Sequence, residues 1–256
     1  MPDYSAQLQA AEAAAKCTGA WLRSRFCEVH RVDAEFAHDL KLRIDKEAQQ
    51  LIADNLRLRF PDYGILGEEG CEAAISGAPV WIIDPIDGTV NYFYGIPLFC
   101  VSIALRVGEQ VVLGCVYDPM RDECFSVSQG TAPTLNGTPI RVSHRREMRE
   151  AVIFVGHGTH DASGEAGIRR FAHLSAQVRK IRILGTAALT LCYIAAGRFD
   201  AYIENRINLW DFAAAAAILE AAGGRFEFTP TAPGACTGAV VAWNGLLPIH
   251  ESMNMN

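Results

Sequence analysis

Two aspartates stand at the end of an apolar run in residues 81–92, which read WIIDPIDGTVNY. Asp84 and Asp87 are three positions apart around Pro85, and a proline-fixed bend can aim both carboxylates at one point. Two close carboxylates repel each other unless a cation lies between them, and hard oxygen ligands suit Mg²⁺. The spacing therefore predicts a cation site, although DPIDG is also typical of an ordinary turn.

The next two residues add a site for an anion. Gly88 and Thr89 offer backbone N–H groups with little steric cover, at a point where the chain leaves a strand. Such groups bind phosphate oxygens at the start of a helix or turn. The stretch thus predicts a cation and an anion side by side, and it lacks the D-x-D-x-D-G order of a calcium loop.

Further carboxylates are needed to complete an oxygen cage, and three positions supply candidates. Glu68 lies between glycines in GEEG at 67–70, where an exposed acidic loop is the alternative. Asp211 precedes an alanine-rich apolar run, and Asp45 opens another helical pattern. Both could simply be helix-capping residues, because an acid in the first turn is stabilised by the helix dipole.

The elements that must position these residues follow from the hydrophobic spacing. Helical periodicity covers residues 4–26 and 45–58, and four strand-like runs follow between 80 and 128, with a tight reversal at Gly108-Glu109 that indicates antiparallel neighbours. After residue 150 strands and helices alternate. We expect strands at 151–155, 182–184, 199–203 and 225–228, and helices at 164–178, 186–196 and 208–222. This order predicts an α/β (α+β) fold with two sheets.

No Ser/Gly linker or internal repeat divides the chain, so we expect residues 1–256 to form a single unit. Its N-terminal α+β half would cover about 1–145 and its C-terminal α/β half about 146–256. The two halves would share one core rather than fold independently.

Composition excludes several classes of protein. The 256 residues are 50% hydrophobic and carry a net charge of −6, and the basic run at 143–150 has no interleaved aromatic residues, so we expect no nucleic-acid partner. Eight cysteines without C-x-x-C spacing indicate small core residues in a reducing compartment. Without a signal-peptide pattern or an 18-residue apolar run, the expected location is cytoplasmic, with no membrane partner.

Three motifs together resemble the signatures of the inositol monophosphatase family: GEEG at 67–70, WIIDPIDGTVNY at 81–92 and LWDFAAAAAILEAAGG at 209–224. Weaker echoes lie at 45–52, 135–143 and 185–204, so the resemblance spans nearly the whole chain in the family's order. It implies a magnesium-dependent, lithium-sensitive phosphomonoesterase. It also implies a layered αβαβα sandwich of the inositol monophosphatase/fructose-1,6-bisphosphatase type, usually a homodimer.

The resemblance also implies a role for each matching residue. Glu68, Asp84 and the carbonyl of Ile86 would hold one Mg²⁺, and Asp84, Asp87 and Asp211 a second, with a weaker third ion near Glu68. The implied catalytic residues are Glu68, Thr89 and Asp45. Phosphate would meet the amides of Gly88 and Thr89. The residues implied to contact the substrate are Asp87, Gly88, Thr89, Gly185, Thr186, Ala187, Glu204 and Asp211.

The implied reaction is in-line attack of a metal-activated water on a small phosphorylated alcohol, for which two cations suit both the nucleophile and the leaving oxygen. Inositol monophosphate is the expected substrate. Histidinol phosphate, fructose 1,6-bisphosphate and 3′-phosphoadenosine 5′-phosphate are alternatives, as is a catalytically idle regulatory homologue.

One segment departs from the family's pattern. At 39–45 the chain reads DLKLRID, which keeps Asp45 but places Leu42 where a small hydroxyl residue is common, and Arg31 and His38 precede it where a lysine is expected. This leaves the third metal site and the substrate range open. The HGTHD stretch at 157–161 indicates a loop at the pocket rather than a second metal site.

Overall fold

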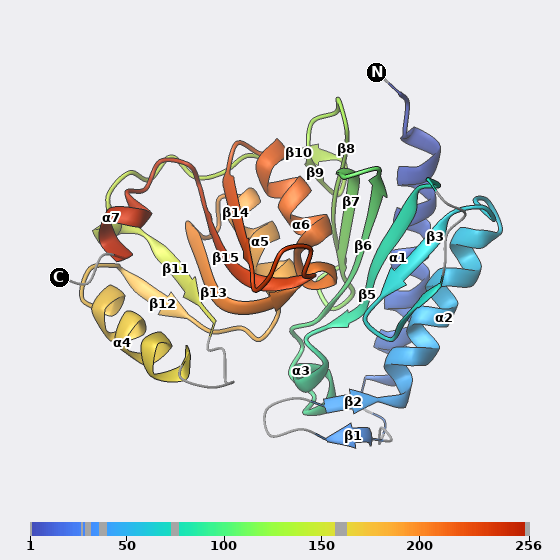
Figure 1. Ribbon diagram of the computed structural model, residues 1–256, viewed down its shortest axis with the longest axis horizontal. Coiled ribbons are helices and arrows are strands. Elements are labelled where there is room, and N and C mark those ends of the chain that lie inside the picture. Colours follow the sequence, from blue (N-terminus) through green and yellow to red (C-terminus); the bar gives the residue numbers. More distant parts are fainter. Residues whose placement is uncertain are drawn as a thin grey trace.

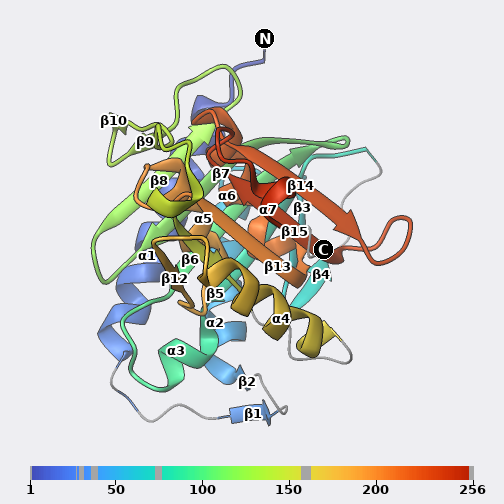
Figure 2. The same ribbon diagram turned by 90° about the vertical axis from the view of Figure 1, so that its left-hand side faces the viewer.

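The computed structural model describes residues 2–26, 28, 32–35, 40–72, 77–156 and 163–253. Five layers alternate helix and sheet along the long axis (Figure 1), and Figure 2 views this stack end-on from the side of α4. Helices α1 (Ser5–Arg25) and α2 (Arg43–Arg57) form one outer layer, and α4 (Ser163–Ser175) and α7 (Ile249–Met253) form the other. Helices α5 (Ala187–Ala195) and α6 (Leu209–Ala221) lie between the two sheets. The predicted αβαβα sandwich is confirmed.

The larger sheet has eight strands in the order β10-β9-β8-β7-β6-β5-β3-β4. Only the β3–β5 pair is parallel, and the predicted antiparallel run from 80 to 128 is confirmed as β5 to β8. The strands are β3 (Gly64–Gly67), β4 (Gly70–Glu72), β5 (Val80–Asp87), β6 (Cys100–Val107), β7 (Gln110–Asp118), β8 (Glu123–Ser128), β9 (Thr134–Leu135) and β10 (Thr138–Pro139).

The smaller main sheet has the order β12-β11-β13-β15-β14. Its strands are β11 (Val152–Val155), β12 (Lys180–Arg182), β13 (Ala201–Asn208), β14 (Arg225–Pro230) and β15 (Thr237–Trp243). Two predictions need correction here. β12 starts earlier than expected because Lys180 pairs with Val152, and β13 runs to Asn208 because β15, which we did not predict, pairs along its length.

Nine short elements were not predicted: β1 (Val32–Glu35), β2 (Leu40–Leu42), α3 (Thr89–Phe93), the 3₁₀ turn η1 (Met148–Glu150), and β3, β4, β9, β10 and α7. They are too short to show a hydrophobic period. The division of the single unit near residue 145 stays a prediction.

Strand β5 explains how the core fixes the site. Trp81 and Ile83 pack in the cluster under α1 and α2, whereas Ile82 packs on the opposite face in the cluster around α5 and α6. Both faces of the sheet are covered, so the strand is apolar throughout rather than alternating. The alanine-rich α6 lies so close to β7 that a Cβ on Gly114 would overlap the backbone of Ala214.

The cysteines are only partly as predicted. Four described thiols, Cys100, Cys115, Cys124 and Cys192, are buried and free, but Cys17 and Cys236 are exposed, so the expectation of a core role is wrong for these two. Cys17 lies outside the buried stripe of α1, and Cys236 directly precedes β15. In the described part of the chain, we find no helix with the length and apolar character needed to cross a bilayer.

Candidate active site

The two predicted aspartates lie near the carboxyl end of β5 and are buried, with exposed fractions of 2% for Asp84 and 7% for Asp87. The pairing of β5 with β6 shifts between them, which makes residues 85–86 a β-bulge within the strand. The bend that we predicted after the strand is therefore inside it, and the strand ends at Asp87. Bulges of this kind re-aim side chains next to active sites. Asp84 Oδ1 accepts a hydrogen bond of 3.1 Å from the amide of Ile86.

A cavity of about 460 Å³ opens where segments far apart in the sequence meet. It lies among the ends of β3 and β5, helix α3, the loop before α5, and β13 with the start of α6. Eleven of the twelve predicted site residues line it: Glu68, Asp84, Ile86, Asp87, Gly88, Thr89, Gly185, Thr186, Ala187, Glu204 and Asp211. The twelfth, Asp45, contacts the cavity wall through Thr89.

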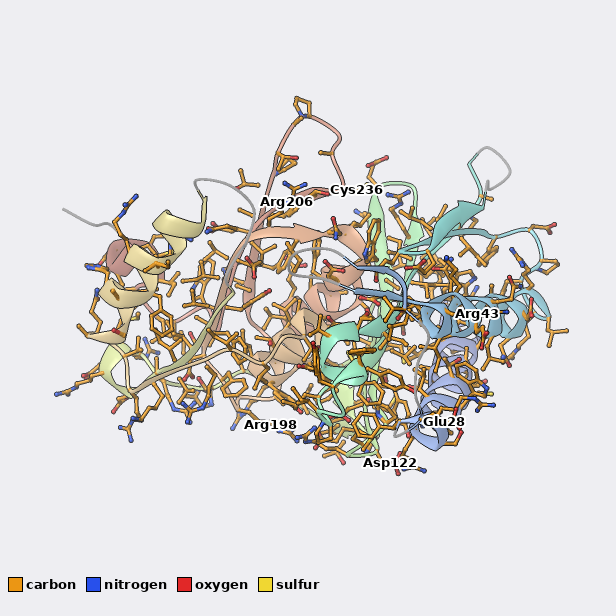
Figure 3. The ribbon with its side chains drawn as sticks, turned by 90° about the horizontal axis from the view of Figure 1, so that it is seen from below. Glu28, Arg43, Asp122, Arg198, Arg206 and Cys236 are labelled. Carbon is orange, nitrogen blue, oxygen red and sulfur yellow. The ribbon has the colours of Figure 1, made fainter. Side chains whose placement is uncertain are left out.

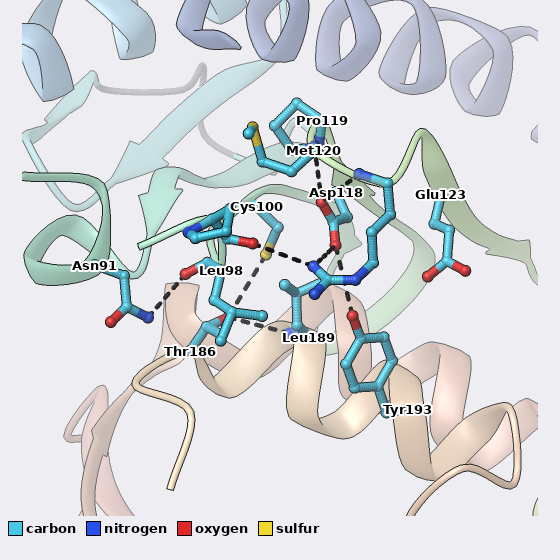
Figure 4. Close-up of polar contacts among 12 residues, drawn as sticks. Asn91, Leu98, Cys100, Asp118, Pro119, Met120, Glu123, Thr186, Leu189 and Tyr193 are labelled. Atoms are coloured by element: carbon cyan, nitrogen blue, oxygen red, sulfur yellow. Dashed lines mark hydrogen bonds and ion pairs between the residues drawn. The ribbon is translucent and has the colours of Figure 1, made fainter. Parts of the chain in front are cut away.

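Asp87 joins the two halves of the molecule. Its carboxylate accepts hydrogen bonds from the Thr186 hydroxyl and from the amides of Ala187 (3.2 Å) and Ala188 (2.7 Å), at the start of α5. Cys100 adds a weaker S–H donor, with Sγ 3.5 Å from Asp87 Oδ2. The same thiol lies 3.9 Å from Thr186 Oγ1, a contact that Figure 4 shows. Burial raises the pKa of Asp87, and these donors oppose that rise by stabilising the charged form.

Asp45 and Thr89 form a second contact in the wall. One carboxylate oxygen of Asp45 accepts the Leu42 amide at 2.8 Å, which caps α2, and the other lies 3.4 Å from Thr89 Oγ1. The Thr89 hydroxyl also lies 3.0 Å from the Ile86 carbonyl oxygen. Leu42 itself is fully buried in the core, so the segment that departs from the family's pattern keeps Asp45 in position by its backbone.

Asp211 repeats this arrangement on α6, where its Oδ2 accepts the Asn208 amide at 2.8 Å. On β13, Glu204 Oε1 accepts the Asn205 amide at 2.8 Å. Gly156 lies directly against the Glu204 carboxylate, because a Cβ at this position would overlap it. The sequence offered capping as the alternative for Asp45 and Asp211, and the structure shows that both cap a helix: Asp211 also lines the cavity, and Asp45 also contacts Thr89 in its wall.

The electrostatics of the cavity are strongly negative. The pKa of Asp84 is raised well above its ordinary value, first by burial and then by the charges of Glu68, Asp87, Asp211 and Asp45. Five carboxylates thus act on one another in a largely buried place, which is costly without a compensating cation.

Nearly the whole chain matches one known protein family. The model of the inositol monophosphatase family matches residues 3–245. The chain belongs to the inositol monophosphatase family. It is accordingly a phosphatase, a phosphoric monoester hydrolase.

Individual relatives agree along most of the chain. Inositol monophosphatase 3 of Solanum lycopersicum is 36% identical over 231 residues, covering 88% of this chain and 86% of the relative. The Thermotoga maritima protein named fructose-1,6-bisphosphatase/inositol-1-monophosphatase is 38% identical over 216 residues, covering 84% and 81%. The crystal structure of extragenic suppressor protein suhB from Bartonella henselae superposes with a TM-score of 0.89 at 31% identity, covering 97% of each chain.

Inositol monophosphatases are generally metal-dependent, and the donor set of this member suits a hard divalent cation, since it consists of carboxylate and carbonyl oxygens. Among the described residues, however, no group of three or more acidic, histidine or cysteine side chains is arranged around one point. Asp45, Asp87 and Asp211 each direct an oxygen toward a backbone amide, and these contacts hold the three carboxylates in place. Burial, and then the charges of the neighbouring acids, raise the pKa of Asp84.

Sequence reasoning missed two residues of the cavity in this member of the inositol monophosphatase family. Asn91 donates hydrogen bonds to the Leu98 carbonyl (2.8 Å) and the Leu184 carbonyl (2.7 Å), so it fastens the two halves together; Figure 4 shows the first bond. Its place directly after DGTV was the available signal. Arg206 lines the cavity from β13, without a motif to reveal it. The predicted residues His157, His160 and Asp161, and Arg31 and His38, lie outside the described residues.

Proposed function

We propose that this protein hydrolyses the phosphomonoester of a small polyol, with Mg²⁺ and by in-line attack of water. Inositol monophosphate is the first candidate substrate. The observation that supports the proposal is the cavity in which the buried Asp84 and Asp87 of β5 meet Glu204 of β13 and Asp211 of α6 beside Gly88 and Thr89. A phosphate monoester resists attack because its negative charge repels a nucleophile and its leaving group is an alkoxide. Both obstacles require positive charge at the site.

Two or three Mg²⁺ ions would be held by Glu68, Asp84, Asp87, Asp211 and the Ile86 carbonyl. When bound, they would lower the pKa of water and stabilise the leaving oxygen. The negative charges of the four other acids all act on Asp84. A carboxylate that is near all of them suits a ligand shared by two ions.

Thr89, Asp45 and Glu68 would manage the proton of the attacking water. The Thr89 hydroxyl has one hydrogen and two acceptors within reach, the Ile86 carbonyl at 3.0 Å and Asp45 at 3.4 Å. Turned toward Asp45, it would accept a hydrogen bond from water and pass the proton to that carboxylate, while Glu68, which also lines the cavity, would orient the water. The amides of Gly88 and Thr89 would bind the phosphate oxygens.

The alcohol would lie toward Gly185, Thr186, Ala187 and Glu204. A carboxylate such as Glu204 accepts hydrogen bonds from hydroxyl groups, and this supports a polyol rather than an apolar alcohol. Fructose 1,6-bisphosphate is the second candidate, because the Thermotoga relative carries both activities in its name.

A phosphate-release panel tests the proposal. The purified protein is assayed with and without Mg²⁺ on inositol 1-phosphate, fructose 1,6-bisphosphate, histidinol phosphate and 3′-phosphoadenosine 5′-phosphate. Asp87→Asn should reduce Mg²⁺-dependent release by roughly a hundred-fold or more, since it weakens a metal ligand, whereas the exposed Asp62→Asn should not. Undiminished turnover in Asp87→Asn would refute the role of the pair, and no release from any substrate would favour the idle homologue.

Two further properties belong to the same proposal. Lithium should inhibit by competing for one of the Mg²⁺ positions, and complete insensitivity would count against the shared metal site. We also expect a homodimer in solution, which sedimentation equilibrium would test directly.

A further inference from the structure

Arg206 is the only positively charged residue among the described residues that line the cavity, where it faces five acids. Its guanidinium is exposed, and none of the described side chains forms an ion pair with it. Figure 3 shows it on the C-terminal half of the molecule, away from Arg43 and Glu28 of the N-terminal half. It belongs to β13, whereas Gly88 and Thr89 line the same cavity from the end of β5 and the start of α3.

Strand β13 fixes the backbone at Arg206. Tyr202 and Glu204 line the cavity from alternate positions of the strand, and Arg206, Ile207 and Asn208 follow them into its lining. The pairing of β13 with β15 shifts between Glu204 and Ile207, so the segment bulges at this point. The amides of Asn205 and Arg206 donate to Glu204 Oε1 at 2.8 and 3.4 Å.

Helix α4 braces the same bulge from outside. The guanidinium of Arg170 donates to Asn205 Oδ1 at 2.6 Å. The bulge is therefore tied both to its own carboxylate and to a neighbouring helix. These contacts fix the backbone from which the Arg206 side chain extends.

We propose that Arg206 binds a second anionic group of the substrate, so that a sugar or polyol bisphosphate gains a contact that the matching monophosphate lacks. This inference rests on the proposed phosphatase function. A second phosphate placed near β13 would be repelled by Glu204 unless a cation met it, and a guanidinium is suited to that contact because its planar N–H groups can bind two phosphate oxygens. A neutral polyol hydroxyl would gain little from the charge.

The alternative role for Arg206 is to offset the negative charge of the cavity as a whole. That role predicts an equal effect on every phosphorylated substrate, because all of them bring the same reacting phosphate. A specific contact predicts an effect only where a second phosphate is present. Two substrates that differ by that group alone therefore separate the two roles.

The test compares fructose 1-phosphate with fructose 1,6-bisphosphate, using Arg206→Gln, Arg206→Lys and the control Arg146→Gln, an exposed arginine outside the cavity. Arg206→Gln should lower kcat/KM for the bisphosphate about ten-fold, mainly through KM, and for the monophosphate less than about two-fold. Arg206→Lys should recover part of the loss, and Arg146→Gln should change neither substrate.

Each other result overturns the inference in a distinguishable way. Equal losses on both substrates, or a wild-type enzyme that hydrolyses the monophosphate but not the bisphosphate, refute the second-anion site and leave the phosphatase proposal standing. A wild-type enzyme that releases phosphate from neither fructose ester nor inositol 1-phosphate refutes both.

Discussion

Replacing Gly88 by alanine should damage the site more than its size suggests. Gly88 lies between β5 and α3 with φ of 100°, a conformation that residues with a Cβ rarely adopt. A Cβ there would lie 2.9 Å from the Leu98 carbonyl oxygen and 3.3 Å from the Gly185 carbonyl oxygen. Both neighbours are backbone atoms, so neither can rotate away.

Two costs add up in Gly88→Ala. The backbone conformation costs about 1–2 kcal/mol for an L-residue, and the forced shift of the neighbouring backbone adds about 1–3 kcal/mol, as for overpacking. Gly108→Ala supplies a matched control, since Gly108 also has a positive φ, 58°, but nothing lies within 4 Å of its Cβ position. It should lose only the first, conformational part.

Urea denaturation of both variants measures the difference. Gly88→Ala should lower the free energy of unfolding by about 1–3 kcal/mol more than Gly108→Ala. It should also lower kcat/KM for inositol 1-phosphate, because Gly185 belongs to the cavity wall and must move, while Gly108→Ala should retain full activity. Equal stability losses in the two variants would contradict the close approach of the Leu98 and Gly185 carbonyl groups to Gly88.

Three other predictions concern the carboxylates. Mg²⁺ at about a hundred times its dissociation constant should stabilise the protein by about 2.7 kcal/mol, raising Tm by ~5–10 °C, and Asp84→Asn should remove this rise; a wild-type Tm that ignores Mg²⁺ argues against the site. Thr186→Val, which removes a hydroxyl from Asp87, should raise the half-saturating Mg²⁺ concentration in activity assays roughly 10- to 100-fold, whereas Thr190→Val, which removes a hydroxyl bonded to the Thr186 carbonyl, should leave it unchanged. Asp200→Asn should lower the free energy of unfolding by about 1–3 kcal/mol in urea melts, because the buried carboxylate accepts from Arg145 at 2.9 Å and from the Val152 amide at 2.7 Å; an unchanged midpoint would show that these bonds add nothing.

The fold was predictable where burial gives an element a regular apolar pattern. Strand β5 and its neighbours to β8 are covered on both faces, so their sequences are continuous apolar runs. Helices α1 and α2 bury one face each, so their apolar residues recur at helical spacing. β13 was predicted too short because Glu204, Asn205 and Arg206 interrupt its apolar pattern, although hydrogen bonds to β15 continue beyond them. Long-range pairing of that kind leaves no local trace in the sequence.

The acidic residues of the site were predictable by type, but their surroundings were not. The sequence showed Thr89 beside two aspartates, and only the fold brings Asp45 within 3.4 Å of its hydroxyl, across 44 positions of chain. Asn91 and Arg206 carry no distinctive spacing, because their roles depend on the loop at 184 and on the bulge in β13.

A structural role in capping a helix and a chemical role in holding a cation do not exclude each other at the same residue. Asp45 and Asp211 each sit in the first turn of a helix and use one oxygen to satisfy a backbone amide, at Leu42 and Asn208. A carboxylate still has free lone pairs after it accepts one such bond. The capping contact therefore fixes the side chain and leaves acceptor sites for a cation. Asp87 is held in the same way by the amides at the start of α5. A carboxylate that must stay buried near four others is held best by backbone donors, since these stabilise its charge and cannot neutralise it by proton transfer. The local signals typical of turns and caps are therefore part of what makes these positions suitable for holding cations.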